Sequence, residues 1–264
     1  RIADVYERVP LSLRRLIVEP AIRRLPVKTK NLSFDFKARR FIEGMNHADM
    51  VARHHIWFGS FTPREQDALL TSDVKSKTDA DVYAQARELY DACDAADPIE
   101  RMQYLDTKLY LAEDILTKVD RTSMAVSLEV RAPFLDKRVV EYAAALPFNY
   151  KLRGRTSKYI LKRAVAPFVP PFVTRRGKKG FGVPVAEWLK HRLRPLARDL
   201  LAPARLRRHG LFDPTYVARL QDEHERGIAN HRKLLWALLV FELWHESFIE
   251  TPRRIEQQRE EIRG

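Results

Sequence analysis

The chain has 264 residues, 45% of them hydrophobic, which is enough for one large domain or two small ones with a buried core. Its 48 Lys and Arg against 35 Asp and Glu give a formal charge of +13, which favours anionic partners such as nucleotides, pyrophosphate or nucleic acid. No run reaches the roughly 18 apolar residues of a membrane helix and the N-terminus is not a signal peptide, so we expect a cytoplasmic protein.

Helix signals recur along the chain and strand signals are scarce, so the sequence predicts a mainly helical fold. Three helix starts place a capping side chain before a proline, at Thr62-Pro63, Asp97-Pro98 and Asp213-Pro214. Helical spacing of apolar residues predicts further helices at 11–25, 32–45, 49–58, 79–95, 137–146, 158–168 and 232–249. Residues 130–134 fit a short extended piece, and the charged tail 251–264 is expected to fray.

Residues 113–136 mix ionised side chains with apolar residues that we expect to be buried. Each buried ion costs several kcal/mol unless it is paired. These side chains must therefore neutralise one another or face a polar ligand: Glu113, Asp114, Lys118, Asp120, Arg121, Glu129, Arg131 and Asp136.

Two basic segments that contain glycine are the candidates for anion binding. In 151–158, Ser157 is the expected N-cap and Lys158 lies in the first turn of the next helix, where free N–H groups attract phosphate. A solvated basic turn remains the alternative. The segment 175–184, with Arg176 and Lys178, suits a lid over phosphates or a nucleic-acid contact, but it lacks the spacing of a P-loop.

No metal site is expected from the histidines, because they show no ligand spacing, and the lone Cys93 excludes an internal disulfide. Aromatic residues at helical spacing are predicted to lie in the core. They are Trp57, Trp188, Trp236, Trp244, Phe241 and Phe248.

Four linked motifs resemble the synthetase domain of the glutamine-hydrolysing asparagine synthetase family. They are Asp114-Ile-Leu-Thr-Lys-Val-Asp-Arg-Thr-Ser-Met-Ala, Leu128-Glu-Val-Arg-Ala-Pro-Phe-Leu-Asp136, Ser157-Lys-Tyr-Ile-Leu-Lys-Arg-Ala and Arg176-Gly-Lys-Lys-Gly-Phe-Gly-Val-Pro. Their order and spacing match the C-terminal part of that domain, and the resemblance covers essentially the whole chain.

The resemblance implies an ATP-dependent ligase with ATP and Mg²⁺ as cofactors. The side-chain carboxylate of aspartate attacks the α-phosphorus of ATP, which gives β-aspartyl-AMP and pyrophosphate, and ammonia from glutamine then displaces AMP. Lys158 matches the lysine that stabilises charge on the phosphates. Residues assigned to substrate or ATP binding are Asp114, Lys118, Asp120, Arg121, Arg176 and Lys178.

Ser123 and Met124 would line the path of ammonia. Glu129 and Arg131 fit either the wall of the active site or a buried ion pair that supports it, and these readings remain open. For Asp136 we favour a helix N-cap, because it precedes Lys-Arg-Val-Val-Glu.

Three features of the family are missing from this sequence. They are a Ser-Gly-Gly-x-Asp-Ser loop that binds pyrophosphate, a nucleophilic N-terminal cysteine and an acidic Gly-Asp-Glu segment for magnesium. We expect all three upstream of Arg1. The predicted fold is thus the helical C-terminal portion of an α/β adenine-nucleotide α-hydrolase-like (PP-loop) domain over residues 1–250, with an exposed apolar face and no activity alone.

Two alternatives to asparagine synthesis remain. The parent could amidate another carboxylate, linked to a peptide or glycan, as relatives within the family do. The chain could also be a non-catalytic basic helical module that binds nucleic acid or a protein partner.

Overall fold

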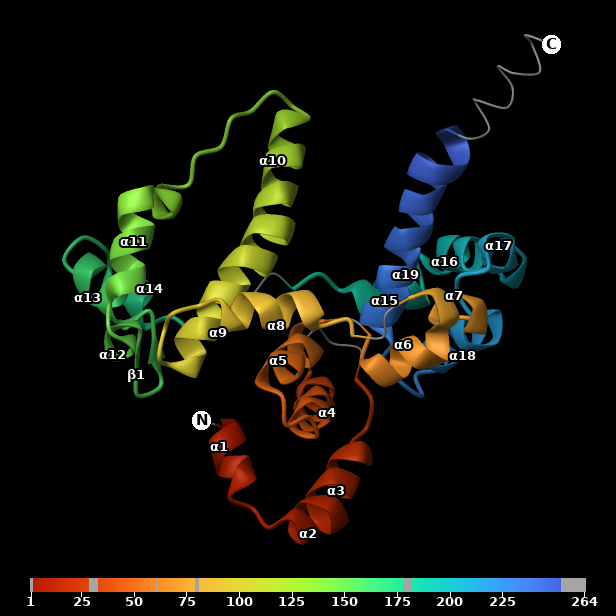
Figure 1. The fold of residues 1–264 in the computed structure, drawn as a ribbon, viewed down its shortest axis with the longest axis horizontal. Coiled ribbons are helices and arrows are strands. Elements are labelled where there is room, and N and C mark those ends of the chain that lie inside the picture. The colour runs from red at the N-terminus through yellow and green to blue at the C-terminus, as the bar shows by residue number, and fades with distance from the viewer. Residues whose placement is uncertain (1, 29–32, 60, 79–80, 178–181, 253–264) are drawn as a thin grey trace. The chain divides into compact units, whose positions relative to one another are not determined.

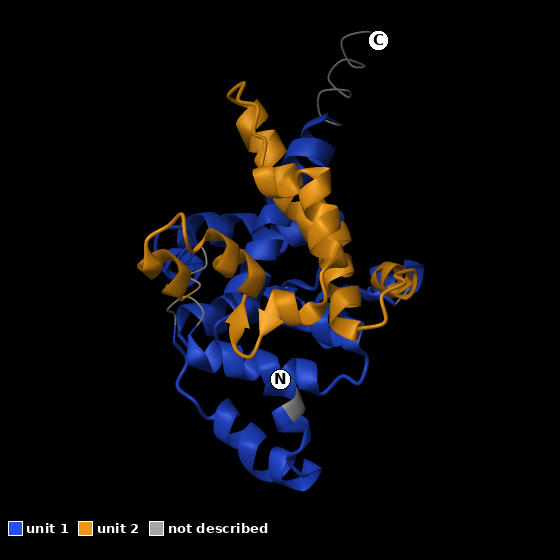
Figure 2. Cartoon of the chain, turned by 90° about the vertical axis from the view of Figure 1, so that its left-hand side faces the viewer, with its two compact units in different colours: residues 1–83, 182–264 blue, residues 84–181 orange. Residues whose placement is uncertain are grey.

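The structure is a computed structural model that describes residues 2–28, 33–59, 61–78, 81–177 and 182–252. These residues fold mainly into helices, as predicted, with one small antiparallel sheet (Figure 1). The chain divides into two compact units, residues 1–83 with 182–264 and residues 84–181 (Figure 2). No helix of the described residues is long and apolar enough to cross a membrane.

The first unit joins the two ends of the chain. Its N-terminal elements are α1 (Ile2–Glu7), α2 (Leu11–Leu13), η1 (Arg14–Val18), α3 (Glu19–Arg23), α4 (Phe34–Met45), α5 (Met50–Phe58), α6 (Pro63–Leu69) and α7 (Ser72–Lys77). Its C-terminal elements are α15 (Val185–Lys190), α16 (Arg194–Leu200), α17 (Pro203–His209), α18 (Pro214–Glu225), α19 (Arg232–His245) and η4 (Glu246–Glu250).

The core of this unit forms around one face of α19. Leu234, Leu235, Leu238 and Leu239 are at most 4% exposed, and α15 to α18 supply further leucines to the same cluster. An antiparallel bridge between Leu70 and Phe212 ties the N-terminal part of the unit to this core. Burial of apolar surface on this scale is the main stabilising contribution.

Sequence-predicted caps begin several of these helices. The side chain of Thr62 accepts from Glu65 N–H at 3.3 Å while Glu65 accepts from Thr62 N–H at 2.8 Å, which is a complete capping box. Asp213 accepts from the N–H groups of Thr215 and Tyr216. Proline at the first helical position follows both caps, so these two predictions are confirmed.

The second unit contains the rest of the helices and the sheet. Its elements are α8 (Ala84–Asp91), α9 (Pro98–Asp106), η2 (Thr107–Leu116), α10 (Thr117–Met124), η3 (Pro133–Leu135), α11 (Lys137–Ala145), α12 (Phe148–Lys151), β1 (Leu152–Arg153), β2 (Thr156–Ser157), α13 (Tyr159–Val165) and α14 (Pro171–Arg175). Asp97 caps α9 by accepting from Ile99 N–H at 2.7 Å, which confirms the third proline-associated start.

Several sequence expectations need correction. The predicted extended piece at 130–134 forms no strand: Ala132 has extended backbone angles, but the short helix η3 begins at Pro133, which favours a turn. Trp236, Trp244 and Phe248 are 39%, 48% and 68% exposed and do not lie in the core. They occupy the face of α19 and η4 opposite the buried leucines, and a helix that is apolar on both faces cannot reveal from its sequence which face is covered.

Candidate functional site

The charged segment begins in an uninterrupted helix formed by η2 and α10, and it is open to solvent. Asp114 and Lys118 pair across one turn, with Nζ to Oδ1 at 3.3 Å, and both side chains are more than half exposed. The expectation that the ions of 113–136 are buried is therefore wrong. Because water still surrounds them, most of the predicted desolvation cost does not arise.

The remaining candidates on this helix lie in its last turns. Asp120 and Arg121 are exposed, Ser123 is partly covered and donates to the Asp120 carbonyl at 3.2 Å, and Met124 is 55% exposed. At this exposure, part of the apolar surface of Met124 is in contact with water, which is unfavourable. The helix thus presents carboxylate, guanidinium, hydroxyl and thioether groups on an accessible surface.

Glu129, Arg131 and Asp136 lie in the segment after α10. Glu129 accepts from Arg131 Nε at 2.7 Å, but the two side chains are 69% and 86% exposed, so the pair exists and is not buried. Asp136 caps α11 by accepting from Arg138 N–H at 3.0 Å, as predicted. The Arg138 side chain and backbone bonds hold the pKa of Asp136 below its ordinary value.

Lys158 occupies an unusual backbone position at the start of α13. Strands β1 and β2 form a hairpin that turns at Gly154, and Ser157 ends β2 instead of capping the helix. Lys158 itself is the N-cap residue, with φ of 55° in the left-handed region. A non-glycine residue there is strained, and such positions cluster at functional sites. The predicted N-cap therefore moves by one residue, from Ser157 to Lys158.

An aromatic contact supports this hairpin. Arg153 donates to the Tyr159 hydroxyl at 2.6 Å and its guanidinium lies 5.0 Å from the centre of the same ring. The contact joins β1 to the first turn of α13. It therefore holds the two sides of Lys158 together.

The second basic loop is only partly described. Residues 171–175 form α14, and Arg176 is exposed at its C-terminal end. Lys178 lies outside the described residues. Among the described residues, no side-chain hydrogen bond or ion pair connects Lys158 or Arg176 with the 113–124 helix.

The residues that the structure describes contain no group of three or more His, Cys, Asp or Glu side chains placed to hold a metal ion. Large apolar side chains are exposed throughout the second unit. They include Val119, Val126, Leu128, Val130, Phe134, Val139, Tyr142, Phe168 and Phe172. The sequence predicted that the chain exposes apolar surface, and these side chains do so.

Sequence reasoning missed a partly buried lysine and a buried His–Glu contact in the first unit. Lys233 donates to the carbonyls of Phe58 and Gly59, and burial beside Arg40 lowers its pKa to about 8. His209 contacts Glu242 at 2.9 Å with both side chains at most 5% exposed. Neither group has a sequence motif, since each meets its partner only through the packing of distant helices.

The chain is mainly helical, and the charged side chains of its candidate site lie on a surface open to solvent. A sequence model described as "Asparagine synthase" matches residues 26–246, which include every candidate site residue. The chain belongs to the asparagine synthase family.

Relatives with this description are similar over much of the chain. A putative glutamine-hydrolysing asparagine synthetase from Mycobacterium tuberculosis is 35% identical over 92% of this chain and 37% of its own length. Asparagine synthetase 1 of Bacillus subtilis is 35% identical over 62% of this chain and 26% of its own. A shorter similarity, 30% over 44% of the chain, links it to amidase chry2 of Gibberella zeae.

The chain spans less than two fifths of the length of the curated relatives that it matches. No solved structure matches it significantly.

Proposed function

We propose that this chain is the C-terminal part of the synthetase domain of an ATP-dependent carbon–nitrogen ligase that makes asparagine with ammonia from glutamine. The observation that carries the proposal is the family match across residues 26–246, which includes both the charged helix and Lys158. The two Mycobacterium and Bacillus relatives named as glutamine-hydrolysing synthetases support the same reaction.

The rest of the enzyme would complete the fold and the site. A PP-loop α/β segment carrying the ATP cradle and the ligands for Mg²⁺ would pack on the apolar side chains exposed in residues 119–172. A separate glutaminase domain would supply ammonia. Exposure of so many apolar side chains is the structural support for such partners.

In the reaction that we propose, an oxygen of the aspartate side chain forms a bond to the α-phosphorus of ATP and the bond to pyrophosphate breaks. The Lys158 ammonium would neutralise charge that develops on the phosphate oxygens. Its position at an N-cap places it beside backbone N–H groups that also favour anions. Arg176 and Lys178 would add positive charge from the second loop.

The second half of the reaction would use the charged helix. Ammonia attacks the acyl carbon of β-aspartyl-AMP, loses a proton and displaces AMP. Ser123 and Met124 would lie along its path, and Asp114, Lys118, Asp120 and Arg121 would contact the substrates. Glu129, Arg131 and Asp136 would hold the adjoining loop, since their bonds are all local.

Replacement of Lys158 tests this assignment in the complete protein that carries the sequence. Lys158→Ala should lower aspartate-dependent pyrophosphate release from ATP by about a hundredfold or more, because a charge aimed at the transition state is lost, while glutamine hydrolysis continues. Lys137→Ala is the control, since Lys137 is 85% exposed and its side chain forms only a local ion pair. Unchanged pyrophosphate release in Lys158→Ala would remove this lysine from the reaction.

A different acceptor carboxylate is the second candidate, and the similarity to an amidase supports it. The same pyrophosphate assay with peptide-linked or glycan-linked carboxylates in place of free aspartate separates the two reactions. An enzyme of the second kind would release pyrophosphate with these acceptors and not with aspartate.

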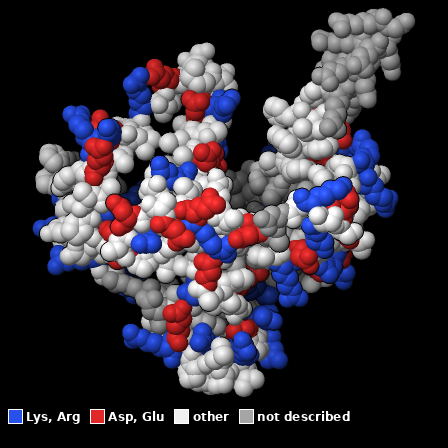
Figure 3. Space-filling view, viewed as in Figure 1, with Lys and Arg blue, Asp and Glu red and all other residues white. Residues whose placement is uncertain are grey.

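Binding of nucleic acid is less well supported. The face in Figure 3 shows blue and red side chains interspersed. A nucleic-acid binder would lose duplex affinity steeply between about 50 and 200 mM salt, whereas the ligase should show no such binding.

A further inference from the structure

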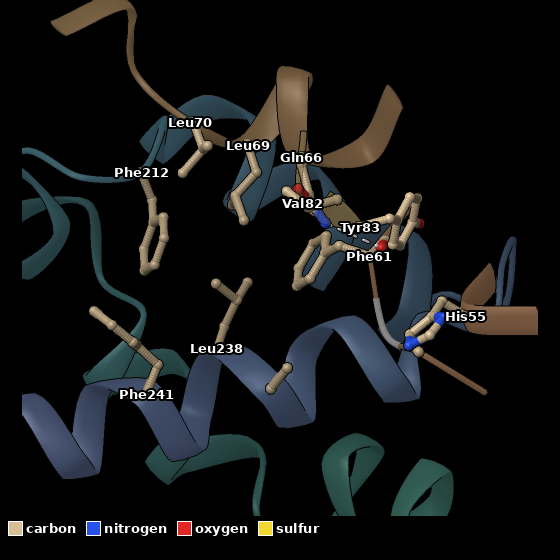
Figure 4. Close-up of a pocket in the computed structure, with 12 residues that line it drawn as sticks. His55, Phe61, Gln66, Leu69, Leu70, Val82, Tyr83, Phe212, Leu238 and Phe241 are labelled. Atoms are coloured by element: carbon tan, nitrogen blue, oxygen red, sulfur yellow. Dashed lines mark hydrogen bonds between the residues drawn. The ribbon is translucent and has the colours of Figure 1, made fainter. Parts of the chain in front are cut away.

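A cavity of about 450 Å³ lies within the first unit, between α5, α6 and α19 (Figure 4). Its wall includes Leu69, Phe212 and Leu238, which are at most 8% exposed. The volume falls in the range of sites that hold small organic molecules. None of the candidate ligase residues lines it.

One end of the cavity is aromatic. Figure 4 shows Phe212 and Phe241 on the side away from His55, with Leu238 between them and the polar residues. The rings of Phe212 and Phe241 pack edge to face with centroids 5.0 Å apart. This pair therefore offers ring edges and faces against which a further aromatic ring can pack.

The opposite end presents polar side chains, and hydrogen-bond acceptors are among their groups. His55 Nδ1 lies 2.9 Å from the Val51 carbonyl, which can only accept, so Nδ1 carries the proton and Nε2 of the neutral ring is an acceptor. Gln66 Nε2 donates to the Phe61 carbonyl at 3.3 Å, which leaves the amide oxygen as its acceptor. Both side chains line the cavity, and Figure 4 shows them at the same side as Tyr83.

We propose that this cavity binds a small aromatic molecule that carries a hydroxyl or N–H donor. The ring would pack against Phe212, Phe241 and Leu238, and the donor would face His55 and Gln66. This site goes beyond the proposed ligase reaction and involves neither ATP nor aspartate.

Ligand-observed ¹⁹F NMR of the 264-residue chain with 4-fluorophenol and fluorobenzene tests the proposal. The two probes share one ring and differ in the hydroxyl donor. We expect 4-fluorophenol to bind about twofold to tenfold more tightly, the range that one net hydrogen bond supplies. Absence of binding by both probes at millimolar concentration, or equal affinity for the two, would overturn the proposal.

Two variants locate the binding. Gln66→Leu should remove part of the preference for 4-fluorophenol and leave fluorobenzene binding intact, whereas the control Gln221→Leu, whose amide bonds to Ala197 outside the cavity, should change neither. Leu238→Trp should fill the cavity and abolish binding of both probes. If circular dichroism shows that Leu238→Trp is unfolded, the comparison of the two glutamine variants decides, and equal probe preference in both refutes the assigned site.

Discussion

Lys233 gives a prediction whose size follows from the structure. It lies in the first turn of α19, where Nζ donates to the Phe58 carbonyl at 2.8 Å and the Gly59 carbonyl at 3.3 Å. Burial, and then the positive charges of Arg40 and Arg232, lower its pKa from 10.5 to about 8. The folded chain therefore holds this proton less tightly than the unfolded chain.

Between about pH 8 and pH 10.5 the unfolded state binds more protons at Lys233 than the folded state, so its contribution to the free energy of unfolding rises with pH. A pKa lowered from 10.5 to about 8 corresponds to about 3 kcal/mol over the whole window. Since the side chain keeps some contact with water, screening reduces this, and we expect roughly 1–2 kcal/mol between pH 7.5 and pH 10.

Urea unfolding of the wild-type chain and Lys233→Met, followed by circular dichroism at several pH values, measures the effect. The wild type should gain roughly 1–2 kcal/mol relative to the variant between pH 7.5 and pH 10. Lys77→Met is the control, because Lys77 is 70% exposed. A difference between wild type and Lys233→Met that does not change with pH would refute the depressed pKa.

Two further substitutions test packing in the first unit. A Cβ added at Gly44 would overlap the Trp57 indole, so Gly44→Ala should lower the free energy of unfolding by about 1–3 kcal/mol, although alanine normally favours a helix; a urea midpoint at or above the wild-type value would contradict this. His209→Ala should cost about 3 kcal/mol, because it leaves buried Glu242 without its 2.9 Å partner. Replacing both residues with leucine should recover much of that loss, and a stable single variant would show that the pair contributes little.

The helix starts were predictable because their determinants are local. Thr62, Asp97, Asp213 and Asp136 each cap a helix through bonds to residues two or three positions ahead. Such bonds need no distant partner, so the order of residues alone specifies them.

The candidate site was only partly predictable for the opposite reason. Burial of the 113–136 ions was inferred from the apolar residues among them, but an apolar side chain is buried only where another element covers it. The hairpin that places Lys158 at the N-cap requires Leu152 to pair with Ser157. The glycine before Arg155 permits this register, but the sequence alone does not predict it.

By itself the sequence determined the helical class, the capped helix starts and, through four linked motifs, the asparagine synthase family. Only the tertiary structure decided that the charged segment is exposed, that Lys158 adopts a left-handed conformation, that Lys233 is partly buried with a lowered pKa, and that the His209–Glu242 pair is buried. Motifs and caps depend on neighbours in the chain, whereas burial and pKa depend on neighbours in space.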